Sequence, residues 1–341
     1  MTDTTRGRLR YAAKLLLGLG LLAALLLMDQ NWRKVLDLAK QARPAYLLPF
    51  FGVSVALIGV SCLKWRLFLR GRSVDLSMIR LMGLYLIGYF FNNFFPSNFG
   101  GDTVRSYILG RQIGSQERAL ATVFLERFTG FIAMVTLAVV AFLFSPALRQ
   151  EPLTKWSILV MGGGLIGVLV VIFWPGVLGW FVSPFRRFDL IRSLEQKAAR
   201  FHGHITHFRG EYGLVARAMI YSYAFYAFAA VNVYYAGLLL GVECSLPQLF
   251  VVTPIVMLLA AFPLTPNSLG IWEWGFSVYL TSAGAAPEQG LAIALALRGK
   301  NLVISLLGGG LFLLEPETYG GEEVAEGAGV ARNESAAQPS S

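Results

Sequence analysis

Long apolar runs separated by short polar segments make up most of this chain. A helix rises about 1.5 Å per residue and the hydrocarbon core of a bilayer is about 30 Å thick, so about 20 apolar residues form one span. No stretch shows the ten-residue alternation of a membrane β-barrel strand. The pattern predicts an all-α, polytopic helical membrane protein with about seven to nine hydrophobic segments, near residues 11–28, 45–63, 79–95, 119–144, 157–174, 214–240, 247–262, 271–285 and 288–314.

Composition excludes a soluble fold and predicts three regions. Hydrophobic residues make up 55% of the 341 and charged residues only 14%, whereas a soluble domain has about a quarter charged residues. We expect a cytoplasmic N-terminus at 1–10, a transmembrane domain at 11–314 and a disordered tail at 315–341, where six Glu face one Arg. Apolar residues at helical spacing between 186 and 210 predict an amphipathic helix on the cytoplasmic surface.

Basic residues predict the orientation of the chain. They cluster in the loop after the second span, from Lys64 to Arg80, and again within 175–214, and the positive-inside rule places both segments in the cytoplasm. Three predicted spans lie between them, so one of the three must not cross. The best candidate ends in the Asn-, Pro- and Gly-rich string at 92–102, which is typical of a backbone that turns back inside the membrane. The first helix follows a basic N-terminus without a cleavage site, which predicts an uncleaved anchor in a bacterial inner membrane with a cytoplasmic N-terminus.

A group of charges inside the apolar segments is the first candidate site. Glu126 and Arg127 lie about 11 Å into a predicted span, where a charge costs roughly 2.5 to 3.5 kcal/mol on insertion scales. Each needs a partner, so we expect Arg105 to pair with Glu126 and Asp102 with Arg127, in a network of four side chains. The candidate head-group-binding residues of this half are Asn92, Asn98, Gly100, Gly101, Asp102, Arg105, Glu126 and Arg127.

Residues 262–273 have the order Phe-Pro, Asn, Gly and an acidic residue, which is the order already found at residues 95–102. One such break in each half is the pattern of transporters built from inverted repeats, whose broken helices meet near the membrane midplane. The alternative is that both breaks are Pro-kinked helix ends. Arg298 and Lys300 lie inside the last predicted span and need a cavity, a carboxylate or a lipid phosphate. The candidates here are Pro263, Asn267, Gly270, Glu273, Arg298 and Lys300.

These residues carry a resemblance to a known family. Asn92, Pro96, Gly100-Gly101-Asp102, Arg105, Glu126-Arg127, Pro263, Gly270 and Glu273 resemble the pattern of the lysylphosphatidylglycerol synthase transmembrane-domain family, also called flippase-like or UPF0104 proteins, over roughly residues 10 to 315. The resemblance implies a lipid-handling membrane module. In the fused synthases this module translocates an aminoacylated lipid made by a separate cytoplasmic domain, which this chain lacks.

Three functions remain open at this stage. The first is translocation or binding of a phospholipid or lipid-linked head group, with aminoacylated phosphatidylglycerol, polyprenyl-type and hopanoid-type lipids as candidates and anionic head groups as the expected partners. The second is an intramembrane lipid head-group transferase with Asp102 or Glu126 as general base. The third is a non-catalytic membrane partner of a lipid-modifying enzyme. We expect no cofactor, no metal and no nucleic acid, and the oligomeric state is left open.

Overall fold

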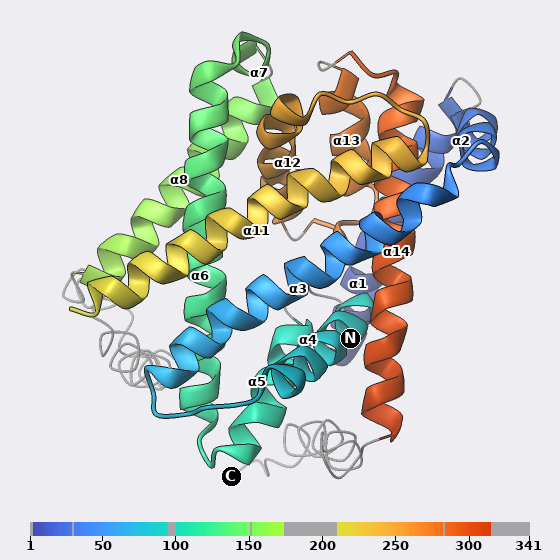
Figure 1. The fold of residues 1–341 in the computed structure, drawn as a ribbon. Helices are drawn as coiled ribbons and strands as arrows, with labels where there is room; N and C mark the ends of the chain where they lie inside the picture. Colours follow the sequence, from blue (N-terminus) through green and yellow to red (C-terminus); the bar gives the residue numbers. More distant parts are fainter. Residues whose placement is uncertain are drawn as a thin grey trace.

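Helices form the secondary structure of the chain in the computed structural model (Figure 1). The structure describes residues 3–28, 31–94, 100–150, 152–173, 210–262, 264–281 and 284–314, and these ranges contain no strand. The helices are α1 (Asp3–Leu27), α2 (Asn31–Lys40), η2 (Pro44–Tyr46), α3 (Leu47–Arg70), α4 (Met78–Phe94), α5 (Gly100–Gln112), α6 (Gln116–Phe144), α7 (Pro146–Gln150), α8 (Pro152–Phe173), α11 (Tyr212–Leu239), α12 (Leu246–Ala260), η4 (Pro266–Ser268), α13 (Ile271–Thr281) and α14 (Pro287–Leu314).

Several of these helices are long and apolar enough to cross a membrane. Four candidate spans meet that test among the described residues, and α1 with α2 makes a fifth if the bent pair is one span. The fold is therefore that of a helical membrane protein, as predicted, but the expected count of seven to nine segments is not confirmed. The four candidates are Pro44–Arg70, Gln116–Phe144, Tyr212–Leu239 and Pro287–Leu314.

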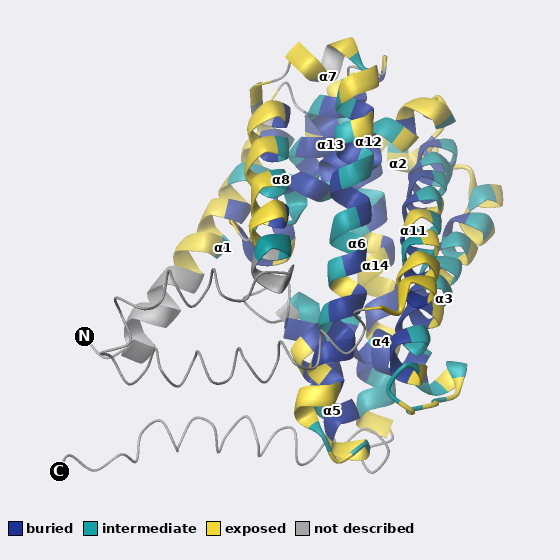
Figure 2. Cartoon of the chain, turned by 90° about the vertical axis from the view of Figure 1, so that its left-hand side faces the viewer, coloured by how far each residue is buried: buried dark blue, intermediate teal, exposed yellow. Residues whose placement is uncertain are grey.

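The surface of the bundle is apolar, as lipid contact requires. Leu48, Phe144 and Leu314 each expose more than four fifths of their surface, while buried positions gather between the helices (Figure 2). Apolar side chains that face outward are unfavourable in water but not in hydrocarbon. Helix α2 was not predicted; it is short and carries basic residues beside an exposed Trp32, with Arg33 stacked over the Trp32 ring at 5.0 Å.

The order of helices in α3–α6 is repeated in α11–α14. Each half has a long helix, two short helices and a second long helix. The starts of α5 and α13 (271 minus 100) and of α6 and α14 (287 minus 116) give the same offset of 171 residues. In Figure 1, α3 and α11 cross the bundle side by side in opposite directions, with α4 and α5 toward one end and α12 and α13 toward the other. This arrangement agrees with the predicted inverted repeat.

Helices α4 and α5 pack tightly against each other as a hairpin. A Cβ atom on Gly101 would lie 1.9 Å from the carbonyl oxygen of Gly88, so only glycine fits at this crossing. The end of α3, the hairpin and the start of α6 all lie at the lower end of the molecule in Figure 1, near the start of α11. The third predicted segment therefore enters and leaves on one side of the bundle, which agrees with a segment that turns back. The amphipathic helix expected at 186–210 lies outside the described residues except for Gly210, and the tail at 315–341 lies outside them as well.

The second predicted span continues further than its hydropathy suggested. We placed Lys64 in a basic loop after a span ending at residue 63, but α3 continues to Arg70 and Lys64 is buried inside the bundle. The hydropathy signal weakens here because Lys64 and Arg66 follow one another closely, although the helix itself goes on. The loop proper is shorter, and its Asp75 accepts hydrogen bonds from Arg66 and Arg70, which lower the pKa of that carboxyl group.

Candidate functional site

Five charged side chains meet where α3, α5 and α6 come together. Arg105 Nη2 lies 2.6 Å from Glu126 Oε2, and Arg105 Nε donates to Asp102 Oδ1 at 2.9 Å. Arg127 donates to both carboxylate oxygens of Asp102, at 2.7 and 2.9 Å. The two predicted pairs and the predicted network of four are thus confirmed. Lys64 adds a fifth member, since its Nζ lies 3.3 Å from Glu126 Oε1.

The glycines at the start of α5 place Asp102 in this network. Gly100 and Gly101 are buried at the beginning of the helix, and the Gly101 amide donates to Asn92 Oδ1 at 2.7 Å. Asp102 therefore lies in the first turn, where the helix dipole favours a negative charge. Asn98 lies outside the described residues. The sequence signal is the Gly-Gly-Asp string itself, because two small residues before an acid allow α5 to approach α4 closely.

The two arginines of the network differ in exposure. The Arg105 side chain is 1% exposed and is enclosed by the rings of Trp65 and Tyr85, at 4.7 and 4.3 Å. Its Nη1 atom is buried without a hydrogen-bond partner. The Arg127 side chain is 49% exposed. Arg105 is therefore the internal counter-ion, while Arg127 is the cation of this network that an incoming ligand can reach.

The second repeat has a simpler pair at its own break. Glu273, fully buried in the first turn of α13, accepts from Arg298 Nε and from the Gly270 amide, the latter at 2.8 Å. Arg298 also donates to the backbone carbonyls of Asn267 and Ser268, at 3.3 and 3.4 Å. Both of those residues have positive φ, so the break turns its carbonyls toward the arginine. Pro263 lies outside the described residues.

The two acid–arginine pairs occupy equivalent positions in the two repeats. In each, the carboxylate is in the first turn of the second short helix and the arginine is 25 residues later on the long helix that follows. The offset of 171 residues relates Asp102 to Glu273 and Arg127 to Arg298. Helices α5 and α13 lie toward opposite ends of the bundle in Figure 1. The chain therefore has two similar charged sites, one at the start of each of these two helices.

The two breaks are joined by a hydrogen bond. Asn267 Nδ2 donates to Asn93 Oδ1 at 3.0 Å, and Asn93 Nδ2 donates to Ser305 Oγ at 2.8 Å. Asn93 is in the last turn of α4 and Asn267 is in η4, 174 residues away. The prediction that broken helices of the two halves meet is thus confirmed at these residues. Asn92 and Asn93 are adjacent residues of the same type, so the contact of Asn93 with Asn267 could not be predicted from the sequence.

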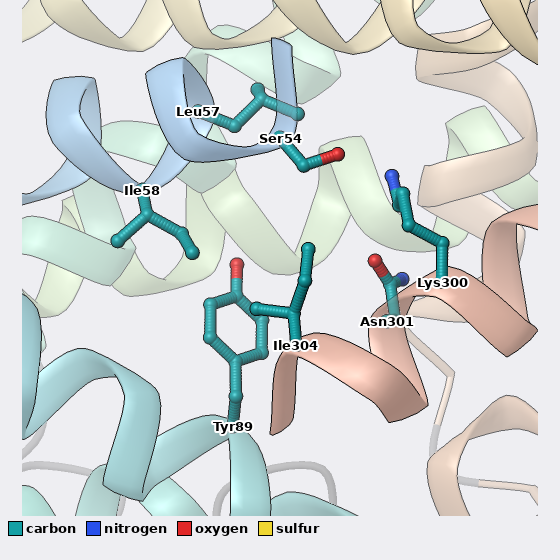
Figure 3. A pocket seen from close by; sticks show the side chains of 7 residues that line it. All are labelled: Ser54, Leu57, Ile58, Tyr89, Lys300, Asn301 and Ile304. Atoms are coloured by element: carbon teal, nitrogen blue, oxygen red, sulfur yellow. The ribbon is translucent and has the colours of Figure 1, made fainter. Parts of the chain in front are cut away.

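Lys300 is separate from the Glu273 pair. It lies on the other side of α14 from Arg298, and its Nζ donates to Asn232 Oδ1 and sits 4.6 Å from the Phe50 ring centre. It also lines a small cavity between α3, α4 and α14 (Figure 3). The sequence predicted that Arg298 and Lys300 each need a cavity, a carboxylate or a lipid phosphate. In the structure Arg298 pairs with the carboxylate of Glu273, and Lys300 lines a cavity. Asn232 was not identified from the sequence, because a lone Asn within an apolar helix carries no motif.

Metal ligands are not gathered anywhere in the described part of the chain. No group of three His, Cys, Asp or Glu residues there has the geometry to hold an ion. Cys62 and Cys244 are free thiols. The three histidines fall within 202–207, outside the described residues.

Comparison with known proteins gives family-level matches. Residues 11–309 match the family described as "Lysylphosphatidylglycerol synthase TM region". A UPF0104 membrane protein of Methanothermobacter thermautotrophicus is 23% identical over 306 residues, which cover 84% of this chain and 90% of the relative. A second UPF0104 membrane protein, from Pyrococcus horikoshii, is 22% identical over 277 residues, which cover 73% and 81% of the two chains. No solved structure matches the chain.

Proposed function

The chain belongs to the lysylphosphatidylglycerol synthase transmembrane-region family, and we propose that it moves a phospholipid or lipid-linked head group across the bilayer. The observation that carries this proposal is the pair of equivalent acid–arginine sites, each at the start of a short helix beside a break, with the two helices directed toward opposite ends of the bundle. Charges inside a membrane are costly, and those that a protein retains there usually mark a substrate or ion pathway. Broken helices in two inverted repeats are the usual way that transporters build such a pathway.

Each of the two arginines is paired with a carboxylate in the structure. Asp102 holds Arg127 by two hydrogen bonds, and Glu273 holds Arg298. A phosphodiester has the same paired oxygens as a carboxylate and is a natural ligand of a guanidinium fork. The head group would therefore replace the carboxylate at one arginine, cross the region where Asn93 and Asn267 meet, and reach the other arginine. The driving force would be a gradient, a partner protein or the lipid's own distribution.

The same proposal places the chain in the cytoplasmic (inner) membrane. The loop between α3 and α4, with Arg66, Arg70, Arg72 and Arg80 in or beside it, lies toward the lower end of the bundle in Figure 1. The positive-inside rule assigns this end to the cytoplasm. Helix α5, which carries Asp102, would then lie toward the cytoplasm and α13, which carries Glu273, toward the opposite side.

Lipid movement by the purified chain in vesicles tests the proposal. Fluorescent anionic, zwitterionic and cationic lipids would be compared for wild type, Arg127→Gln and Arg298→Gln at equal folded yield. Arg70→Gln is the matched control, since Arg70 forms an arginine–carboxylate pair with Asp75 on the surface, where both side chains are 56% exposed. We expect each internal variant to slow lipid movement at least tenfold, as the loss of one charge-assisted hydrogen bond implies. We expect the control to behave as wild type.

Two results would reject this function. If wild-type protein moves none of the lipids, the chain is not by itself a translocator, and an enzyme or a membrane partner of one becomes the better explanation. If both internal variants move lipid as fast as wild type, the acid–arginine pairs are structural. Turnover of a lipid head group by the purified protein would favour the transferase, with Asp102 or Glu126 as its base.

A further inference from the structure

Lys300 differs from the four cations of the two acid–arginine sites in having no carboxylate partner among the described residues. Lys64, Arg105, Arg127 and Arg298 each lie within ion-pair distance of Asp102, Glu126 or Glu273. The hydrogen-bond acceptor that faces Lys300 is the neutral Oδ1 of Asn232. Lys300 is nevertheless only 5% exposed. One positive charge in the middle of α14 is therefore not neutralised by the side chains around it.

The first repeat shows what a neutralised version of this contact looks like. There, Lys64 of α3 pairs with Glu126 of α6, so the first and last helices of that repeat are joined by a lysine and a carboxylate. In the second repeat the corresponding helices, α11 and α14, are joined by Asn232 and Lys300. The lysine is on the first helix in the first contact and on the last helix in the second, and the offset of 171 residues relates Glu126 to Leu297, so the two contacts are not equivalent positions of the repeat. The lysine of the second contact faces an amide and has no acid among the described residues that balances it.

A buried ammonium without a counter-ion opposes folding. Removing it from water is costly, and that cost is recovered only when charge and hydrogen bonds are supplied inside. The Phe50 ring and the Asn232 amide supply part of this, because both present partial negative charge to Lys300 Nζ. Asn232 is itself fixed by donating to the Phe50 carbonyl and to Ser54 Oγ, both at 3.0 Å. The surroundings therefore position the ammonium without neutralising it.

The ammonium lies beside an open space. Lys300 lines a cavity of about 30 Å³ together with Ser54, Tyr89 and Asn301, and Leu57, Ile58 and Ile304 form its apolar wall (Figure 3). In Figure 3, Lys300 and Ser54 extend toward the same space, and the Tyr89 hydroxyl approaches it from α4. A volume of this size holds a water molecule or one oxygen atom of a larger group. A whole head group would not fit unless the helices moved apart.

We propose that this cavity is an anion subsite in which Lys300 receives a phosphoryl oxygen of the transported head group. The inference rests on the proposed function and adds to it the chemical group that the pathway selects. A phosphoryl oxygen supplies the missing negative charge and accepts from the ammonium, and the Tyr89 hydroxyl and the Asn301 amide that line the cavity can donate to its lone pairs. The Ser54 hydroxyl, by contrast, already donates to the Phe50 carbonyl. The same chemistry could be met by free phosphate, so the two sources must be separated by experiment.

Binding by the purified full chain tests the subsite. Thermal unfolding in neutral detergent would be followed during titration with short-chain phosphatidylglycerol, with short-chain phosphatidylcholine or with inorganic phosphate. We expect phosphatidylglycerol to stabilise wild type, and Lys300→Met to raise the half-effective concentration at least tenfold, which is the weight of one charge-assisted hydrogen bond. Lys34→Met is the matched control, because Lys34 is a half-exposed lysine paired with Glu288 outside the cavity. A Lys300-dependent response to inorganic phosphate alone would assign the site to the free ion, and a response to phosphatidylglycerol alone would assign it to the lipid.

The stability of the ligand-free protein supplies a second test. If Lys300 is kept for ligand binding, Lys300→Met should unfold at a higher temperature than wild type, since it removes an unbalanced buried charge. Lys300→Gln, which retains a donor for Asn232, replaces it if the Met variant does not fold. An unchanged phosphatidylglycerol midpoint, or a lower unfolding temperature in both variants, would overturn the subsite. If Lys300→Met moves lipid as fast as wild type, the subsite is rejected but the proposed transport is not. Lys300-dependent binding without any lipid movement rejects the proposed transport and keeps the subsite.

Discussion

Replacing Glu126 with Gln removes the carboxylate that lies between two buried cations. Its oxygens are 2.6 Å from Arg105 Nη2 and 3.3 Å from Lys64 Nζ, and all three side chains are at most 6% exposed. Removing one partner of a buried ion pair costs about 3 to 5 kcal/mol. Arg105 Nη2 still pairs with Asp102 Oδ1 at 2.9 Å in this variant, so the lower end of that range applies. We therefore expect the free energy of unfolding to fall by about 3 kcal/mol.

Equilibrium unfolding in mixed micelles measures this loss. Gln has nearly the size of Glu and can still accept a hydrogen bond from Arg105, so the change isolates the charge. Glu243→Gln, at an exposed position, is the control and should leave stability unchanged. A cycle with Lys64→Met should show a coupling of about 1 to 3 kcal/mol between the two sites. If Glu126→Gln is as stable as wild type, the network does not hold the bundle together.

Two further changes test the hairpin and the meeting of the breaks. Gly101→Ala would place a Cβ atom 1.9 Å from the Gly88 carbonyl oxygen, so we expect destabilisation of about 1 to 3 kcal/mol, measured by the same unfolding assay. Asn267→Gly keeps the positive φ of 46° accessible but deletes the hydrogen bond to Asn93, so lipid movement in vesicles should change by more than twofold while the unfolding midpoint moves little.

The pairing inside the first repeat could be predicted because it rests on local geometry. Glu126 and Arg127 are neighbours on one helix and point about 100° apart, so each had to find its partner elsewhere. Asp102 and Arg105 are three residues apart on one helix face, so they offer a carboxylate to Arg127 and a guanidinium to Glu126. The family resemblance drawn from the same residues is confirmed by the match over 11–309.

Long-range packing decided what the sequence could not predict. Lys64 follows an apolar run and resembles a loop residue until the crossing of α3 with α11 buries it. Asn232 gains its role from Phe50 and Ser54, about 180 residues away along the chain. The break pattern in each half was visible, but the offset of 171 residues that relates Asp102 to Glu273 required the helix boundaries.

The equivalence of the two acid–arginine pairs has a kinetic consequence. If Arg127 and Arg298 lie on one pathway, a head group meets both in turn, and the slower passage limits the rate. The double variant, which carries both Arg127→Gln and Arg298→Gln, should then move lipid about as slowly as the slower of the two single variants. If each arginine instead serves a separate route, each single change should leave about half of the wild-type rate, and only the double variant should abolish movement. Rates from the vesicle assay with all three variants at equal folded yield distinguish these cases. A double variant at least tenfold slower than either single one would contradict a single pathway limited by one passage, because the two sites would then act together on the same step.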